Sequence, residues 1–222
     1  HAKILSTDLR GAATRIVRLK EGWGSRLAGA FSCGVEGFVL QGNLYVGSTS
    51  LTDYEYAFIP GDGVVGAFRS ESGAVALLMT SGPIRYDTST GGRRADVVVG
   101  RPSETSWQVD AEVRGLFRRP VATTRLGEVW LGSTQLDPET QVWHSHPHDD
   151  ELFVLEGSIA CSDLLGDQSL ETTAGPGSYF YRPKSTVHTA PTARTEGSIV
   201  TFNRSFGAFE PMGLEYPPDN DR

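Results

Sequence analysis

The chain has 222 residues and a formal net charge of −7, from 20 Lys and Arg against 27 Asp and Glu. This length allows one large domain or two small ones, and the acidic balance argues against a nucleic-acid-binding surface, which needs clustered Lys and Arg. With 38% hydrophobic and 21% charged residues the chain is not a disordered acidic segment, and its 26 glycines suit an all-β protein with many tight turns.

Short runs rich in Val, Ile, Phe, Tyr and Trp recur along the chain, separated by Gly, Pro, Asp and Ser, and this pattern is typical of strands and turns. In chain order the predicted strands are Thr14–Leu19, Gly37–Tyr45, Tyr56–Ile59, Val75–Met79, Glu128–Ser133, Glu151–Ile159, Ser178–Tyr181 and Ser198–Asn203. No segment sustains helical spacing over three turns. Because many strand edges need protection, we expect an all-β fold of closed or double-sheet antiparallel type.

A repeat within the sequence organises these strands. Val35–Gly42 (VEGFVLQG) matches Asp150–Gly157 (DELFVLEG), and Ile59–Gly63 (IPGDG) aligns with Gly175–Tyr179 (GPGSY). A shift of about 115 residues between the copies predicts two β-domains. We expect a first domain over residues 1–90, a linker over 91–112 and a second domain over 113–222.

Histidines concentrate in the second copy. His144 and His146 stand at alternate positions, so on a strand both side chains face the same side and can present two imidazoles to one ion. Pro147 then breaks the strand, which places His148 in a turn. A fourth histidine of this copy, His188, lies about 40 residues further on.

The segment from His144 to His188 resembles the two motifs of the cupin superfamily. The first motif, HxH followed by a glutamate and a glycine, reads HSHPHDDELFVLEG here, ending at Gly157. The second motif reads Gly177, Pro183, Ser185 in place of Gly, His188, and Thr192 in place of Asn. The second copy is similar in its motif residues to the ChrR-like cupins. The resemblance implies two cupin-type barrels in tandem, each a double-stranded β-helix or jelly roll.

The resemblance also implies a metal site in the second domain. His144, His146 and His188 match the family's three histidine ligands, and they would hold one divalent transition metal, with Fe(II) favoured and Zn, Mn, Ni or Co as alternatives. The motif spacing places a carboxylate ligand at Asp150, whereas the family's usual residue type favours Glu151. A three-histidine site without a carboxylate is the third alternative.

The first copy is degenerate, because it offers no equivalent ligand set. Aligned on Trp23, it presents Gly24 and Arg26 at the histidine positions of the first motif and Ser72 near that of the second. We therefore expect the first domain to bind no metal and to serve a structural role.

These features together favour a metal-dependent cupin enzyme acting on a small molecule, with a dioxygenase-type oxygenase on a carbonyl, enol or aromatic substrate preferred. Asp150, Glu151 and Tyr181 are the candidate acid–base groups. A metal-dependent lyase or isomerase is one alternative, and a non-catalytic, metal-binding ChrR-like sensor or effector-binding module is another. Arg182 and Arg204 could bind an anionic substrate, but we expect both to be solvated.

Cysteine usage and hydropathy bear on location and partners. Two cysteines far apart give no disulfide framework, and no apolar run approaches the roughly 18 residues of a membrane span. We expect a cytoplasmic protein with a small-molecule substrate and no nucleic-acid or membrane partner. A homodimer paired through sheet edges is a further expectation.

Overall fold

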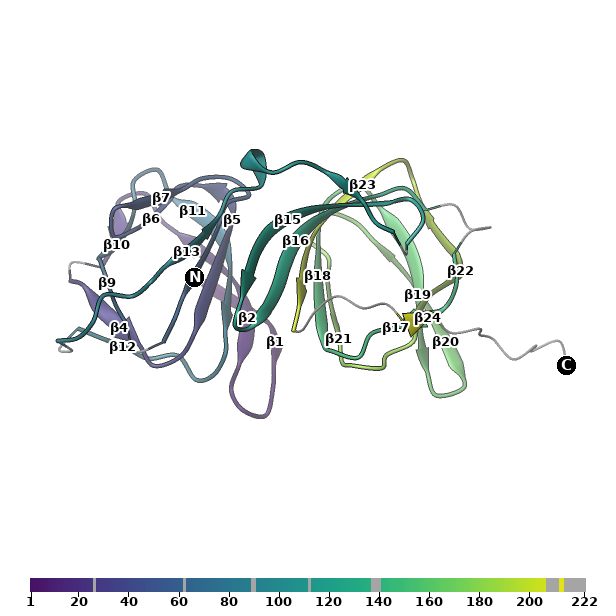
Figure 1. Ribbon diagram of the computed structural model, residues 1–222, viewed down its shortest axis with the longest axis horizontal. Helices are drawn as coiled ribbons and strands as arrows, with labels where there is room; N and C mark the ends of the chain where they lie inside the picture. The colour runs from purple at the N-terminus through teal and green to yellow at the C-terminus, as the bar shows by residue number, and fades with distance from the viewer. Residues whose placement is uncertain are drawn as a thin grey trace, which may run out of the picture. The chain divides into compact units, whose positions relative to one another are not determined.

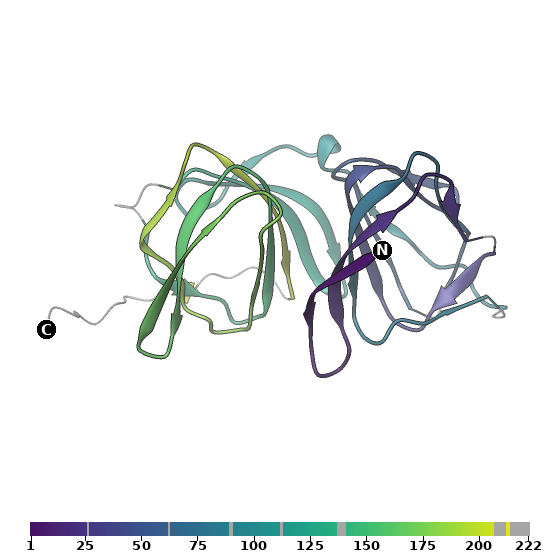
Figure 2. The same ribbon diagram turned by 180° about the vertical axis from the view of Figure 1, so that it is seen from behind.

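The computed structural model describes residues 1–25, 27–61, 63–88, 91–111, 113–136, 141–206 and 212–213, and the side chains of 190, 191, 212 and 213 are outside that description. The chain divides into two compact units, His1–Pro102 and Ser103–Arg222. Within each unit the strands curve around an interior of their own (Figure 1), as the view from behind also shows (Figure 2).

The strands of the first unit form three sheets, in which each strand is hydrogen-bonded to the next one named. The six-stranded sheet contains β1 (Ala2–Thr7), β2 (Ala13–Leu19), β11 (Ala74–Thr80), β5 (Val35–Gly42), β8 (Tyr56–Ile59) and β13 (Val98–Gly100). The four-stranded sheet contains β3 (Trp23–Gly24), β10 (Phe68–Ser70), β6 (Leu44–Val46) and β7 (Thr49–Leu51). The three-stranded sheet contains β12 (Tyr86–Asp87), β4 (Gly29–Phe31) and β9 (Val64–Val65). Apolar side chains from these sheets, among them Val35, Leu51 and Ile59, pack into one buried cluster.

The second unit has two sheets. The six-stranded sheet contains β14 (Gln108–Val109), β15 (Leu116–Thr124), β16 (Gly127–Thr134), β23 (Ile199–Ser205), β18 (Asp150–Glu156) and β21 (Tyr179–Arg182). The five-stranded sheet contains β20 (Gln168–Ala174), β19 (Ile159–Leu165), β22 (His188–Thr195), β17 (His144–Ser145) and β24 (Met212–Gly213).

The prediction of an all-β fold is confirmed. In the described part of the chain the only helical element is a short 3-10 helix, η1 (Pro102–Glu104). No helix there has the length and apolar character that crossing a membrane requires. Each of the eight predicted strands overlaps an observed one, although two predicted ranges, Gly37–Tyr45 and Glu151–Ile159, each run through a turn into the next strand.

Two matched glycines explain those turns. Gly42 ends β5 with φ of 92°, and Gly157 follows β18 with φ of 78°, a left-handed backbone that glycine adopts most readily. A Cβ atom at Gly157 would lie 2.7 Å from the carbonyl oxygen of Ser198, so a side chain would also collide with the neighbouring strand. The matched glycines of the sequence repeat therefore allow the same turn after the strand in both copies.

The larger sheets of the two units share their strand order. The series β1-β2-β11-β5-β8 corresponds to β15-β16-β23-β18-β21. When the matched sequences of β5 and β18 are superposed, the pairing register makes Tyr56–Pro60 (YAFIP) equivalent to Tyr179–Pro183 (YFYRP). The sequence alignment of Ile59–Gly63 with Gly175–Tyr179 is therefore wrong, because it matched two Pro-Gly turns instead of the paired strands.

The smaller sheets correspond as well: β7-β6-β10 matches β20-β19-β22, and β12-β4-β9 matches β24, β17 and the start of β22. Gly29 lies opposite Val65 across β4 and β9, as His144 lies opposite His188 across β17 and β22, and Ala30 lies opposite Asp87 as Ser145 lies opposite Met212. Val65 thus takes the place of the second-motif histidine, and Gly29 and Phe31 take those of His144 and His146. The sequence alignment gave these places to Ser72, Gly24 and Arg26, because it was anchored on the Pro-Gly turns and on Trp23. Arg26 lies outside the described residues.

Candidate metal centre

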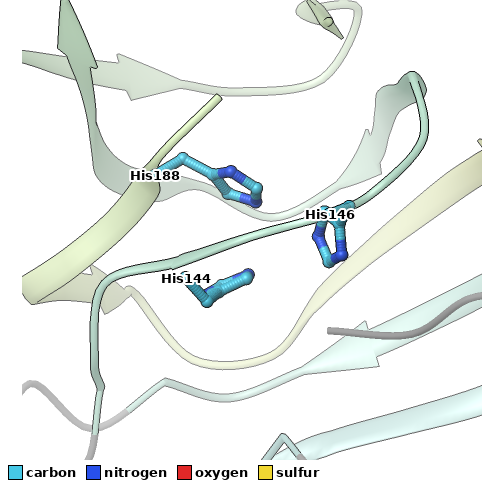
Figure 3. A group of neighbouring side chains, drawn as sticks. All are labelled: His144, His146 and His188. Atoms are coloured by element: carbon cyan, nitrogen blue, oxygen red, sulfur yellow. The ribbon is translucent and has the colours of Figure 1, made fainter. Parts of the chain in front are cut away.

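Three histidines meet in the second unit. His144 lies in β17, His146 directly follows that strand, and His188 opens β22, where it is the direct cross-strand neighbour of His144. Each ring offers one nitrogen, and these nitrogens all lie within 4.8 Å of one another. Figure 3 shows the three rings gathered between the two segments that carry them. Among the described residues this is the one group of metal-ligand side chains with such spacing.

Backbone geometry holds the two histidine-bearing segments together. The Ser185 N–H donates a hydrogen bond of 2.8 Å to the carbonyl of His146. Ser185 has φ of 66°, the left-handed conformation that suits the glycine of the cupin motif at this position. Thr189, next to His188, has φ of 87°, which a β-branched residue rarely adopts, and strained residues of this kind cluster at functional sites.

Hydrogen bonds orient two of the rings for metal binding. The Nδ1 of His188 lies 2.9 Å from the carbonyl oxygen of Thr186, and the Nδ1 of His144 lies 3.3 Å from that of Val142. Because a carbonyl oxygen only accepts, each Nδ1 carries the proton, and Nε2 keeps its lone pair for a cation. Burial lowers the pKa of His144 and lowers that of His188 well below 6.5, with Arg182 acting in the same direction. Neutral imidazoles, the form that binds metals, therefore prevail.

The remaining histidine of this copy stands beside the group. His148 lies in a bend after Pro147, as the sequence predicts, and its side chain is buried. Its ring stacks on that of His146 with the centroids 5.5 Å apart. His148 is not one of the three close ligand residues.

A cavity of about 120 Å³ lies against the three histidines. Apolar side chains form much of its wall, including Leu116, Trp130, Leu136, Phe180 and Ile199. Polar residues also border it, including Gln141, Asp150, Cys161, Arg182, Asn203 and Ser205. One water needs roughly 10–15 Å³ on this measure, and a cavity of about 150 Å³ holds benzene. The space therefore fits a small organic molecule.

The two candidate carboxylates point to opposite faces of β18. Both residues border the cavity, but Asp150 lies opposite Arg182, which also borders it, whereas Glu151 lies opposite Tyr181 and Arg204, which do not. Because side chains alternate along a strand, the carboxyl of Asp150 is on the cavity face and that of Glu151 on the other. Neither carboxylate belongs to the close group of three histidines.

The carboxyl group of Asp150 has an unusually high pKa. Desolvation by burial raises the pKa of its carboxyl from 3.8 to about 6, although the nearby Arg182 opposes the rise. Asp163, Asp149 and Glu151 add to it through charge repulsion. A carboxyl of this kind can both hold and release a proton near neutral pH.

Glu151 belongs to a buried network that the first unit repeats. Its carboxylate accepts a hydrogen bond of 2.6 Å from the Tyr179 hydroxyl and forms an ion pair of 3.0 Å with Arg204. In the first unit the equivalent Glu36 accepts a hydrogen bond of 2.6 Å from the equivalent Tyr56. That half of the chain has no histidine beyond His1, so the Glu–Tyr pair also occurs where no histidine cluster accompanies it.

Tyr181 faces away from the cavity. Its side chain is 40% exposed, and its hydroxyl donates a hydrogen bond of 2.9 Å to Asp149. It lies between Phe180 and Arg182, which both border the cavity, and strand alternation turns its ring to the opposite face. The candidate acid–base group of the sequence therefore lies apart from the three histidines.

The two arginines expected to be solvated are both buried, so that expectation is wrong. Arg182 is 6% exposed and Arg204 is 3% exposed. Each is compensated by an acid from another strand, Arg204 by Glu151 and Arg182 by Asp163 at 2.9 Å. No local pattern in the sequence reveals such partners, because they come from strands far apart along the chain.

No family model matches the chain, and no curated protein matches it. Solved structures do. A Nostoc punctiforme protein named as a "putative dioxygenase" is 22% identical with a TM-score of 0.80, over 98% of this chain and 78% of that chain. A mutant of Bacillus subtilis oxalate decarboxylase is 11% identical with a TM-score of 0.68, over 97% of this chain and 77% of that chain.

A third structure, protein Ylba from E. coli, is 15% identical with a TM-score of 0.60, over 92% of this chain and 81% of that chain. At these identities the likeness shows the fold. It confirms the expected architecture of two cupin-type barrels in tandem. Together with the three histidines, this fold supports a divalent metal site in the second barrel.

Proposed function

We propose that the chain is a metal-dependent oxygenase of dioxygenase type, acting on a small molecule that contains a carbonyl or enol group. The observation that carries the proposal is the convergence of three imidazoles on a small cavity with a largely apolar wall. Ligand sites are commonly concave and apolar with a few polar groups that orient the ligand.

The donor set fits a transition metal. His144, His146 and His188 would hold one divalent ion, with Fe(II) favoured over Zn, Mn, Ni or Co, since imidazole nitrogens suit all of these ions. Such an ion, when bound, supplies Lewis-acid activation of a carbonyl oxygen and, if it is redox-active, chemistry with O₂. The first barrel has Gly29, Phe31 and Val65 at the equivalent positions, none of which offers a ligand atom, and its proposed role is structural.

Asp150 is the proposed proton-transferring group. Its carboxyl lies on the cavity face of β18 and would accept the proton lost when a carbonyl compound becomes an enolate, then return it at the end of the reaction. Glu151 and Tyr181 have other contacts and are not needed for this step. The volume of about 120 Å³ restricts the substrate to a few non-hydrogen atoms beyond those bound at the histidines.

Two other functions use the same site. A metal-dependent lyase or isomerase would also need the proton transfer of Asp150, but it would consume no O₂. A ChrR-like sensor would bind its effector without turnover. The acid on the cavity face favours an enzyme over a sensor, because recognition alone does not need a proton acceptor there.

The proposal is tested by purifying the full chain without chelator, determining its metal content and screening oxygen uptake with small carbonyl and enol compounds. His146→Ala should remove both the metal and the uptake. His1→Ala, which changes an exposed histidine outside the group, is the matched control and should alter neither. Oxygen uptake that persists in metal-free His146→Ala would end the proposal, and substrate loss without uptake would replace it by the lyase or isomerase.

A further inference from the structure

We infer that Arg182 is a carboxylate-binding residue, and that the molecule bound in the cavity is a small carboxylic acid held by its guanidinium group beside the three histidines. This inference rests on the proposed function, since it names the substrate class of the same cavity. The inference gives a role to Arg182, which is not among the metal ligands that the two cupin motifs supply.

Three contacts fix the guanidinium of Arg182 without using all its donors. Nε donates a hydrogen bond of 2.9 Å to Asp163, and Nη2 lies 3.8 Å from the Cys161 sulfur. The ring of Phe180 lies beneath the group, with its centroid 4.8 Å from Cζ. Within the described residues no protein atom accepts a hydrogen bond from Nη1. A rigid planar group with donors to spare at a cavity wall matches the two oxygens of a carboxylate.

The position of Arg182 links it to the histidines. Its partner Asp163 lies in β19 directly opposite His188. Arg182 also borders the same cavity as His144, His146 and His188. An anion between Arg182 and a metal ion held by the histidines would therefore be attracted from two sides.

The first barrel shows that the fold does not require this arginine. The residue equivalent to Arg182 is Ile59, and the residue opposite it across the sheet is Val35. Both are buried in the apolar cluster of the first unit, with exposures of 4% and 2%. Burying an arginine costs free energy that an isoleucine of similar location does not. The second barrel thus carries a buried charge for a purpose other than closing the sheet.

The charges around Arg182 leave it available to an anion. Its own counter-charge, Asp163, is engaged through Nε alone. Among the described residues no ion pair joins Arg182 to Asp150, although the two are cross-strand neighbours on the cavity wall. A bound carboxylate would complete the hydrogen bonding of the outer guanidinium nitrogens and leave the proton-accepting carboxyl of Asp150 separate.

The test titrates the Co(II)-loaded full chain with acetate and follows its visible absorption, at constant ionic strength. Acetamide, the uncharged isostere, serves as the second probe. The variants are Arg182→Met, Arg182→Lys and, as the matched control, Arg194→Met, which removes an exposed arginine of the same unit. We expect Arg182→Met to weaken acetate binding roughly ten- to hundredfold, the range for a hydrogen bond between charged groups. Arg182→Lys should retain part of the acetate affinity, and Arg194→Met should bind acetate as tightly as the wild type. The response to acetamide should be weak in the wild type and in every variant.

Metal content separates this inference from the proposed function. If the wild-type chain binds Co(II) but acetate binds equally well to Arg182→Met, the carboxylate role of Arg182 is refuted and the metal site stands. If the wild-type chain binds no Co(II), the proposed function fails first. Should Arg182→Met not fold, Arg182→Met with Asp163→Asn removes both charges, and the same loss of acetate affinity is expected.

Discussion

The stability of the metal-free protein should depend on pH through Asp150, and Asp150→Asn isolates that dependence. The pKa of this carboxyl is 3.8 in an unfolded chain and about 6 in the fold, because burial disfavours the charged form. The group therefore contributes its full stability below pH 3.8, and this contribution is lost as the pH rises through about 6. Asparagine has a similar shape and no charge, so the free energy of unfolding of the variant does not fall when the pH rises through this range.

The size of the effect follows from the two pKa values. A rise from 3.8 to about 6 corresponds to about 3 kcal/mol, at about 1.4 kcal/mol for each pH unit. Relative to the wild type, Asp150→Asn should gain about 3 kcal/mol in the free energy of unfolding between about pH 4 and about pH 7.5. Urea unfolding at a series of pH values, with the metal removed by a chelator, measures this gain.

Asp167→Asn is the control, because Asp167 is an exposed carboxylate of the same unit. Its stability difference from the wild type should stay nearly constant over the same pH range. A difference between Asp150→Asn and the wild type that is equally flat would refute the claim that the carboxyl of Asp150 is desolvated on the cavity face.

The remaining predictions concern the scaffold and the hydroxyl group of Tyr181. Glu36→Gln and Glu151→Gln should each lower the free energy of unfolding by about 1–3 kcal/mol, the cost of disturbing a buried hydrogen bond. Glu151→Gln should leave the metal content unchanged, and a loss of metal would instead make Glu151 a metal ligand. Gly157→Ala should destabilise the protein by more than about 1 kcal/mol and by more than Gly166→Ala, which has the same sign of φ but open space around it, as thermal unfolding can show. Tyr181→Phe should preserve metal content and oxygen uptake, and a large loss of uptake would place its hydroxyl in the reaction after all.

The sequence alone predicted the architecture because its signals are local. The alternating apolar runs and the glycines at Gly42 and Gly157 reflect strand geometry and turn geometry, which neighbouring residues determine. The same holds for His144 and His146, since their spacing of two residues directs both rings to one side of the chain. The convergence with His188 followed from the family motif.

The choice between Asp150 and Glu151 required strand register. Aligning the Pro-Gly turns hid the match of Tyr56–Pro60 with Tyr179–Pro183, and with it the repeated Glu–Tyr pair to which Glu151 belongs. Comparison of the two copies by their strands, instead of by their turns, would have revealed the pair from the sequence.

The burial of Arg182 had no sequence signal of comparable strength. Arginine is exposed in most proteins, and its burial here depends on Asp163 and Phe180, whose positions are set by the closure of two sheets. Long-range pairing of this kind becomes visible only in the folded chain.

The central claim is that three imidazoles of the second barrel bind one metal ion. X-ray absorption spectroscopy at the metal edge of the loaded full chain tests it directly, because scattering from the outer ring atoms counts the bound imidazoles. We predict three imidazole nitrogens at about 2.0–2.2 Å, falling to two in His188→Ala. A spectrum with one imidazole or none, or a His188→Ala spectrum identical to the wild type, would contradict the claim.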